Sequence, residues 1–452
     1  MPLASVSELV AVERCTAIER LDLGGLPHNE SGQPMLDLLV GASCPALLTG
    51  GADIKRLLNS WSRWRYVRDS AAAGISVDWM REGVDTFTYW DNDSVLAKKL
   101  GSPPDHNKVQ SEGAHFIDAV RMHPGVARFG GPVHRFSEGL ARDIAGPLFA
   151  PPAQSEAARH LTFFASARGI TCAAHFDNLV NIHLVVLGKK RIRLAPPAAA
   201  FDLLTRPGAH PSSRQARCSL ASPIATPCSY EGPVLEANLS RGEAIFIPSG
   251  WFHEFAALEP SVALSATANV PEWIDFNKWA STERREMIPF VTKESLAKPW
   301  TPQRFASTLM VFVPALLVAL GLIDDAPGSD LASGRYLRRT FLRQYNSETR
   351  REAGLIWPPG KARPWKCSAA DGRDAETAHS AAQSAANRFL TRYRRDLMPI
   401  YVSLYLENIL SFVAPKYSDR GIEARFAALI EFVEVCLAPT ETQSVVQEKS
   451  EL

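Results

Sequence analysis

The sequence predicts an α+β protein with a β-rich centre, a mixed α/β lead-in and an all-helical C-terminal region. Short β-prone runs separated by Gly and Pro recur between residues 160 and 270, which is typical of a barrel or sandwich. From about residue 276 onward, apolar residues recur instead at helical spacing. A chain of 452 residues is also too long for one ordinary hydrophobic core, so more than one domain is expected.

Three regions follow from these patterns. Residues 1–145 are expected to form an α/β lead-in that packs on the barrel, and residues 146–275 to form the barrel itself. Residues 276–452 are expected to form a helical domain that mediates dimerisation or covers a substrate.

The lead-in alternates short apolar runs with turn residues. Residues 45–49 are β-prone and end at a Gly-Gly pair, whereas Leu57, Leu58 and Trp61 then fall at helical spacing. These patterns predict strands at 45–49, 75–79 and 86–90, and helices at 54–64, 112–122 and 133–144.

The barrel region contains β-prone runs at 161–164, 181–187, 191–194, 244–247 and 262–266. Gly188 and Lys189 stand between two of these runs and predict a two-residue hairpin turn. Residues 205–234 are rich in Pro, Ser and Ala and show no periodicity, which predicts a long loop between the two halves of the barrel.

The C-terminal region carries apolar residues three to four positions apart, as at Phe426, Ile430 and Val433. This spacing predicts helices at 282–290, 304–323, 334–345, 376–396, 397–413 and 423–437. Residues 354–374 are interrupted by Pro and Gly and are expected to form a linker.

The charge and the apolar pattern exclude some classes of partner. The formal net charge is +1, so nothing indicates a mainly electrostatic nucleic-acid partner. The longest apolar run, 309–323, is shorter than the roughly 18 residues of a spanning helix and contains Pro314 and Gly321. No secretory signal is visible at the start of the sequence. We therefore expect a soluble, cytoplasmic protein without a membrane partner.

The seven cysteines are widely scattered and none belongs to a CxxC pair. An odd count at wide spacing is not typical of a disulfide framework or of a zinc cluster. We therefore expect reduced thiols, in keeping with a cytoplasmic location.

The residues with the clearest chemical meaning lie in the stretch TCAAHFDNLVNIHLVVLGKKRIRLAPP, residues 171–197. His175 and Asp177 are two positions apart, so in an extended segment both side chains leave the same face. The natural third ligand is His253, which follows a short apolar strand and a Pro-Ser-Gly break. Two histidines and one carboxylate on one face are the ligand set of non-haem Fe(II) oxygenases.

Residues 160–270 resemble the JmjC-type, cupin-8 branch of Fe(II)/2-oxoglutarate-dependent oxygenases. The resemblance rests on an HxD motif entering a strand, a Gly followed by basic residues, and a distant Gly-led strand that ends in PSGWFH. The segments PALLTG and FGGPVHRFSEGLARDI also resemble the lead-in of that branch, which includes the asparaginyl hydroxylase that inhibits hypoxia-inducible factor. The likeness spans about residues 40–275.

The resemblance implies a double-stranded β-helix of the cupin or jelly-roll type that holds Fe(II) through His175, Asp177 and His253. It also implies that a lysine anchors the distal carboxylate of the cosubstrate 2-oxoglutarate. Lys190 matches this position and Lys189 is the adjacent rival; we favour Lys190, because only one of two neighbours in a strand points inward.

Further cosubstrate positions are implied by the same resemblance. Asn181 and Asn269 match asparagines near the cosubstrate. Cys172 stands where the family has a hydroxyl-bearing residue, so we assign Thr171, its neighbour, to the cosubstrate site.

In the family, 2-oxoglutarate and O₂ give succinate and CO₂ while a bound C–H group is hydroxylated. We therefore expect a hydroxylase of a peptide or protein side chain. A small-molecule hydroxylase of a biosynthetic pathway is the alternative, JmjC demethylase activity stays open, and a catalytically idle cupin binding module is the alternative from another class. A homodimer through the C-terminal helices is expected.

Overall fold

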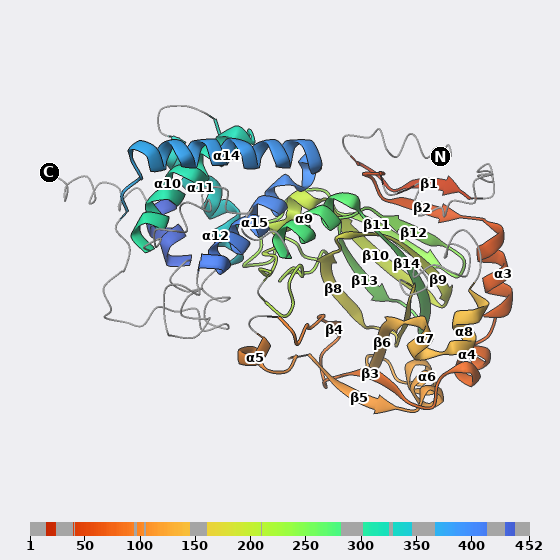
Figure 1. Cartoon of the computed structure of the whole chain (residues 1–452). Coiled ribbons are helices and arrows are strands. Elements are labelled where there is room, and N and C mark those ends of the chain that lie inside the picture. Colours follow the sequence, from red (N-terminus) through yellow and green to blue (C-terminus); the bar gives the residue numbers. More distant parts are fainter. Residues whose placement is uncertain are drawn as a thin grey trace. The chain divides into compact units, whose positions relative to one another are not determined.

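The computed structural model describes residues 15–23, 39, 41–94, 97–103, 105–144, 161–208, 210–281, 302–324, 329–345, 367–413 and 430–438 (Figure 1). The chain forms two compact units, the first made of residues 1–91, 101–203 and 214–273 and the second of residues 92–100, 204–213 and 274–452. The first unit keeps the lead-in and the barrel together, and the division into three regions stays a prediction.

The first unit contains a nine-stranded sheet. Its order is β1 (Glu19–Asp22), β2 (Ala46–Thr49), β12 (Ala244–Ile247), β9 (Leu179–Leu187), β14 (Ser261–Asn269), β7 (Leu161–Ser166), β6 (Ala127–Pro132), β3 (Ile75–Met80) and β5 (His106–Ser111). Strands of the lead-in therefore extend the barrel sheet at both edges, because β2 pairs with β12 and β6 pairs with β7.

A second sheet has five strands, in the order β11 (Leu235–Ser240), β10 (Lys189–Ala195), β13 (Phe252–Ala257), β8 (Thr171–Phe176) and β4 (Thr86–Phe87). Apolar side chains from both sheets meet in one buried cluster: Leu47, Val185, Ile192, Leu194, Leu239, Ile245, Ile247, Trp251 and Phe255. This arrangement confirms the α+β class with a cupin-type β core.

Helices of the first unit are α3 (Ala52–Ser60), α4 (Trp64–Ser70), α6 (Gly113–Met122), α7 (Val133–Phe136) and α8 (Glu138–Asp143), with a short 3₁₀ turn at Pro197–Ala200. A buried aromatic group joins them to the large sheet. In it, Phe136 of α7 stacks on Phe163 of β7 with ring centroids 4.1 Å apart, and Trp61 lies 6.1 Å from Phe163. Packing thus accounts for these aromatics without a role in binding.

The expected hairpin at Gly188 and Lys189 is wrong. Strand β9 pairs with β12 and β14, whereas β10 pairs with β11 and β13, so the chain passes from one sheet to the other at Gly188. Gly188 has φ +76°, and a Cβ there would lie 2.0 Å from the carbonyl oxygen of Pro260. Turn residues indicate a reversal of the chain, but they do not say which strand each arm will pair with.

The second unit is helical. Its elements are α5 (Ala97–Leu100), most of α9 (Pro271–Ser281), α10 (Pro302–Ala319), α11 (Ser329–Arg339), α12 (Phe341–Gln344), α14 (Gly372–Arg392), a 3₁₀ turn (Arg395–Leu397), α15 (Met398–Val413) and a π-helical turn (Val433–Leu437). Its aromatic core includes Trp279, Phe389 and Tyr405, with Trp279 stacked on Tyr405 at 5.0 Å. The helix expected at 282–290 and most of that at 423–437 lie outside the described residues.

The expectation of reduced thiols is wrong for six of the seven cysteines. Disulfides join Cys15 to Cys44, Cys218 to Cys228, and Cys367 to Cys436, and Cys172 is the free cysteine. Wide spacing in sequence misled the prediction, because the fold brings the paired Cα atoms within 5.1 to 6.3 Å. The cytoplasmic location loses this support and stays a prediction.

Among the described residues, no helix combines the length and the apolar character needed to cross a bilayer. The longest apolar run forms α10, which contains Pro314 and buries Phe312, Leu316 and Leu317. These three side chains are packed in the core of the second unit.

Candidate metal centre

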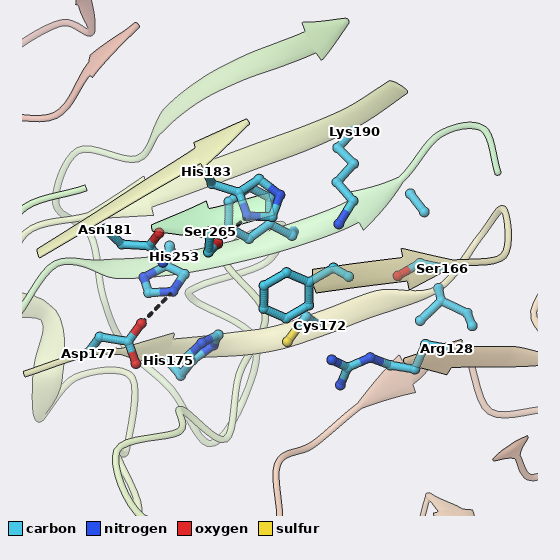
Figure 2. Close-up of a pocket in the computed structure, with 14 residues that line it drawn as sticks. Arg128, Ser166, Cys172, His175, Asp177, Asn181, His183, Lys190, His253 and Ser265 are labelled. Atoms are coloured by element: carbon cyan, nitrogen blue, oxygen red, sulfur yellow. Dashed lines mark hydrogen bonds and ion pairs between the residues drawn. The ribbon is translucent and has the colours of Figure 1, made fainter. Parts of the chain in front are cut away.

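Three side chains that could hold a metal converge on one point in the first unit. His175 is the next-to-last residue of β8, Asp177 is the residue after that strand, and His253 lies on β13, the neighbouring strand of the five-stranded sheet. His175 and His253 are directly opposite each other in the antiparallel ladder. One ligand atom from each of the three residues lies within 4.8 Å of the others (Figure 2).

A bulge in β8 lets its side chains reach this point. His253 pairs with His175, and Phe255 pairs with Cys172, so three steps along β8 match two along β13. The extra residue reverses the alternation of side chains on one strand, so Cys172 and His175 face the same side. Thr171, next to Cys172, is thereby turned to the opposite face.

Hydrogen bonds orient both imidazoles. Nδ1 of His175 donates to the carbonyl oxygen of Ala173 at 2.8 Å, and Nδ1 of His253 donates to that of Trp251 at 3.1 Å. In a neutral ring this contact places the proton on Nδ1 and leaves Nε2 available to a metal, and His253 Nε2 lies 3.6 Å from Asp177 Oδ2. A backbone partner that fixes the tautomer in this way is usual for metal-binding histidines.

The charges at the site also favour a cation. Burial lowers the pKa of His175 to about 4, with repulsion from His253 acting in the same direction, so the ring is neutral near pH 7. Burial alone would raise the pKa of Asp177, but His253, His175 and Arg214 outweigh it and hold that pKa below its usual value. Two neutral imidazoles and one carboxylate are the forms in which these groups bind metal.

Backbone contacts hold the two ligand strands together. The N–H of Gly250, in the Pro-Ser-Gly break, donates to the carbonyl oxygen of Asp177 at 2.8 Å. Ser249 accepts a hydrogen bond of 2.8 Å from the indole of Trp273. Strand β12 ends at Ile247 and β13 begins at Phe252, so the break expected from the sequence separates the two strands.

The triad opens into a small cavity of about 80 Å³ between the two sheets. Its lining is Arg128, Phe164, Ser166, Ile170, Cys172, His175, Asp177, Asn181, His183, Lys190, His253, Phe255, Ala257 and Ser265 (Figure 2). The nine-stranded sheet supplies one wall through β6, β7, β9 and β14, and the five-stranded sheet supplies the other through β8, β10 and β13.

The two candidate lysines differ in their surroundings. Lys190 is 4% exposed and lines the cavity, whereas Lys189 is exposed and forms an ion pair of 3.1 Å with Glu259. Burial lowers the pKa of Lys190 to about 7, and the charge of Arg128 acts in the same direction. Lys190 is therefore the lysine placed to meet an anion inside the cavity.

The other residues assigned to the cosubstrate lie in different places. Asn181 lines the cavity, and its buried Oδ1 has no hydrogen-bond partner. Thr171 and Asn269 are not among the lining residues, since Thr171 is turned away by the bulge and Asn269 is exposed at the end of β14. Their role at the cosubstrate site stays a prediction.

Some residues that line the cavity are not marked by a local motif in the sequence. Nδ1 of His183 lies 2.8 Å from Ser265 Oγ. Arg128 was also missed, although an arginine between Ala127 and Phe129 in a β-prone run is a signal. An isolated charge in a buried strand indicates either an ion pair or a ligand contact.

The part of the chain that contains this site matches a known protein family. A model of the cupin-like domain family matches residues 35–266, which is more than half of the chain. The chain belongs to the cupin-like domain family. The match covers the metal triad and most of both sheets.

Curated relatives are similar over shorter stretches. Lysine-specific demethylase JMJ31 of Arabidopsis thaliana is 28% identical over 146 residues, covering 30% of this chain and 26% of the relative. JmjC domain-containing protein C of Dictyostelium discoideum is 27% identical, covering 19% and 21% of the two chains. The tRNA wybutosine-synthesizing protein 4 of Gibberella zeae is 33% identical, covering 21% and 9%.

The chain thus spans about a quarter or less of the length of these relatives. Over these stretches the chain is similar to JmjC proteins, and the specific likeness to the asparaginyl hydroxylase stays a prediction. The X-ray structure of Escherichia coli ycfD is 18% identical over 31% of this chain and 32% of that one, with a TM-score of 0.20. That score is too low to carry an argument.

Proposed function

We propose that this cupin is an Fe(II)/2-oxoglutarate-dependent oxygenase that hydroxylates a side chain of a peptide or protein. The observation that carries the proposal is the convergence of His175, Asp177 and His253 on a cavity that also contains Lys190. A metal site and a buried cation in one small cavity match a cosubstrate with a chelating end and a distal carboxylate.

The donor set fits Fe(II). His175 and His253 would each bind through Nε2 and Asp177 through a carboxylate oxygen, which leaves the remaining coordination positions open. When bound, the metal and 2-oxoglutarate supply the activation of O₂ for attack on a C–H bond. The protein supplies the orientation of these groups and the exclusion of water.

The side chains of the cavity have separate tasks in this proposal. Lys190 holds the distal carboxylate of 2-oxoglutarate by its charge, and Asn181 offers an amide beside the metal ligands. Phe164 and Phe255 present apolar rings, each 5.6 Å from the Lys190 ammonium. These apolar rings exclude water from the site. Because little water then screens the Lys190 charge, it attracts an anion more strongly.

Demethylation is a second candidate, favoured by the similarity to the Arabidopsis lysine-specific demethylase. The same site would then hydroxylate an N-methyl group of lysine, and the product would lose formaldehyde. Stable hydroxylation adds one oxygen to the peptide, whereas demethylation releases formaldehyde and removes a methyl group. Mass spectrometry of a reacted peptide pool, together with a formaldehyde assay, separates the two candidates.

The first test is succinate formation from 2-oxoglutarate with Fe(II) and ascorbate, without any substrate. Slow turnover in the wild-type protein that is lost in His175→Ala is the expected result, because the variant loses one of three ligands. The control is His123→Ala, since His123 is exposed and outside the cavity.

If wild-type protein shows no turnover, Mn(II) and 2-oxoglutarate binding is measured next. Binding of both would mean that turnover requires the missing substrate, whether a peptide or a small molecule. If the protein binds neither Mn(II) nor 2-oxoglutarate, the proposal is contradicted. A catalytically idle cupin binding module is then the remaining hypothesis.

A homodimer through the C-terminal helices is part of this proposal. In the described part of 274–452, the exposed large hydrophobic side chains are Ile274 and Leu390, which such an interface would cover. Sedimentation equilibrium at micromolar concentration tests the dimer, and a monomer alone would contradict it.

A further inference from the structure

Arg128 is a buried cation to which the proposed reaction assigns no role. It lies on β6, in a segment where Ala127 and Phe129 are buried apolar neighbours, and it is 6% exposed. It lines the same cavity as the metal triad (Figure 2). A guanidinium is rarely buried without a partner, because its desolvation is costly.

The partners of Arg128 inside the protein leave it incompletely satisfied. Its Nη1 lies 3.9 Å from Asp78 Oδ2, beyond hydrogen-bond distance, and this buried atom has no hydrogen-bond partner. Asp78 is also shared with His106, whose Nε2 lies 3.6 Å from Asp78 Oδ1. The Arg128 guanidinium carbon lies 3.5 Å from the centroid of the Phe87 ring. This contact fixes the guanidinium in place, while its Nη1 can still donate a hydrogen bond to a ligand.

Lys190 is the second basic residue of the cavity; it is 4% exposed, and its ammonium lies 5.6 Å from the ring centroids of Phe164 and Phe255. Figure 2 shows Lys190 and Arg128 entering from opposite walls, at the end of the cavity away from His175 and Asp177. The charge of Arg128 contributes to the lowered pKa of Lys190, so each cation lies in the field of the other. Among the described residues, Asp177 is the one carboxylate that lines the cavity, so this end presents two basic side chains and no lining carboxylate.

Cys172 lines the same cavity from β8, and Figure 2 shows it beside the Arg128 guanidinium. Its thiol is a weak hydrogen-bond donor, so it cannot replace a hydroxyl as a partner for a carboxylate. The guanidinium of Arg128 has five donors in a planar fork, which suits a carboxylate well.

We propose that Arg128 acts with Lys190 as a second anchor for the distal carboxylate of 2-oxoglutarate. The inference rests on the proposed function and adds a positioning residue from the lead-in, far in sequence from the HxD motif. One carboxylate has enough lone pairs to accept hydrogen bonds from both cations. Arg128 thereby makes the dianion, rather than a keto acid with an uncharged tail, the preferred ligand.

The experiment compares two keto acids on protein loaded with Mn(II). 2-Oxoglutarate carries the distal carboxylate, and 2-oxopentanoate has the same chain length without it. In Arg128→Gln, we expect 2-oxoglutarate affinity to fall on the order of 10- to 100-fold, the usual cost of a charged hydrogen bond. Affinities for 2-oxopentanoate and Mn(II) should be unchanged, because neither contacts Arg128.

Two further variants keep the result interpretable. Arg128→Lys retains the charge next to Asp78 and should bind 2-oxoglutarate with intermediate affinity, even if Arg128→Gln folds poorly. Arg142→Gln is the matched control, since Arg142 is exposed and lies outside the cavity. It should leave every affinity unchanged.

The inference is overturned if Arg128→Gln and Arg128→Lys bind 2-oxoglutarate as tightly as wild type. Equal weakening of both keto acids also overturns it, because the loss would then come from a disturbed cavity. Wild-type protein that binds Mn(II) but neither keto acid overturns it together with the proposed cosubstrate. Wild-type protein that binds no metal rejects the oxygenase itself, so these failures are distinguishable.

Discussion

His175 and His253 face each other across the β8–β13 ladder, with their ring centroids 4.2 Å apart. Each ring is oriented by the backbone carbonyl of the residue two positions before it, and Asp177 completes the group from the position after β8. Repulsion between the rings contributes to the lowered pKa of His175, so a metal would replace an unfavourable contact by two bonds.

Mn(II) should therefore stabilise the wild-type protein against thermal unfolding. A ligand that binds only the folded state at 100 times its Kd contributes about 2.7 kcal/mol. His253→Ala should lose this stabilisation, because two ligands remain. The control is His134→Ala, an exposed histidine outside the cavity, which should respond like wild type. An equal Mn(II) shift in His253→Ala would show that the metal binds elsewhere.

The binding of 2-oxoglutarate should depend on pH through Lys190. Burial, aided by Arg128, lowers the pKa of Lys190 to about 7, and a bound anion raises it again. Below pH 7 the lysine is already charged, so affinity should be flat with respect to this group. Above pH 7 binding must take up a proton, so affinity should fall as pH rises.

Calorimetry in buffers of different ionisation enthalpy measures that proton. Uptake should approach one proton per 2-oxoglutarate at pH 8 to 9 and disappear below pH 6, given a pKa of about 7. Lys190→Arg is the control, because an arginine remains charged throughout this range and should bind without uptake. Constant affinity of the wild type from pH 6 to pH 9 would argue against Lys190 as the anchor.

The sequence predicted the triad because its information is local. The spacing of His175 and Asp177 and the Pro-Ser-Gly break before His253 are short motifs with a direct geometric meaning. Strands such as β9, β12 and β14 were predicted for the same reason, since alternation and turn residues act within a few positions. Strands β8 and β13, which carry the two histidines, were not among the predicted runs. The α+β class followed from the change in period near residue 276.

What the sequence could not show depends on contacts between distant segments. The role of Gly188 at a corner between sheets depends on which strands pair, and the bulge that turns Thr171 away appears only against β13. Arg128 reaches the cavity because β6 pairs with β7, a pairing that no local motif encodes. The three disulfides could not be predicted for the same reason, because the pairing of the cysteines depends on the fold.

The disulfides give a prediction of their own. Disulfides stabilise mainly by restricting the unfolded chain, by roughly 3–4 kcal/mol for loops of these lengths. The pair Cys367–Cys436 closes 69 residues and Cys218–Cys228 closes 10, so Cys436→Ser should lower the free energy of unfolding more than Cys228→Ser.

Peptide mapping without reductant checks the pairing itself. It should find three linked pairs and one free thiol, at Cys172. Alkylation of all seven cysteines in denatured, unreduced protein would instead restore the expectation of reduced thiols. Persistent disulfides would also indicate an oxidising compartment.

A buried carboxylate in the second unit makes a final prediction about pH and stability. Glu407 is 6% exposed; it accepts a hydrogen bond of 2.9 Å from the Tyr345 hydroxyl and another of 3.0 Å from the N–H of Gly208. Burial nevertheless raises the pKa of Glu407 to about 7, because these two bonds only partly offset the loss of solvation.

The sign of the effect follows from this raised pKa. The protonated acid is favoured in the fold, so its contribution is complete below the ordinary value of 4.5 and is lost as pH rises through about 7. A shift of this size corresponds to about 3 kcal/mol in the free energy of unfolding. Glu407→Gln stays neutral, so its stability relative to wild type should increase between pH 4.5 and pH 7 and then stay constant.

Thermal unfolding of both proteins across this pH range measures the difference. Glu376→Gln is the matched control for the substitution itself, because Glu376 is exposed on α14. A constant difference for Glu407→Gln would mean that Glu407 is already ionised in the fold. In that case the bonds from Tyr345 and Gly208 would outweigh burial, and the network would favour the carboxylate rather than the acid.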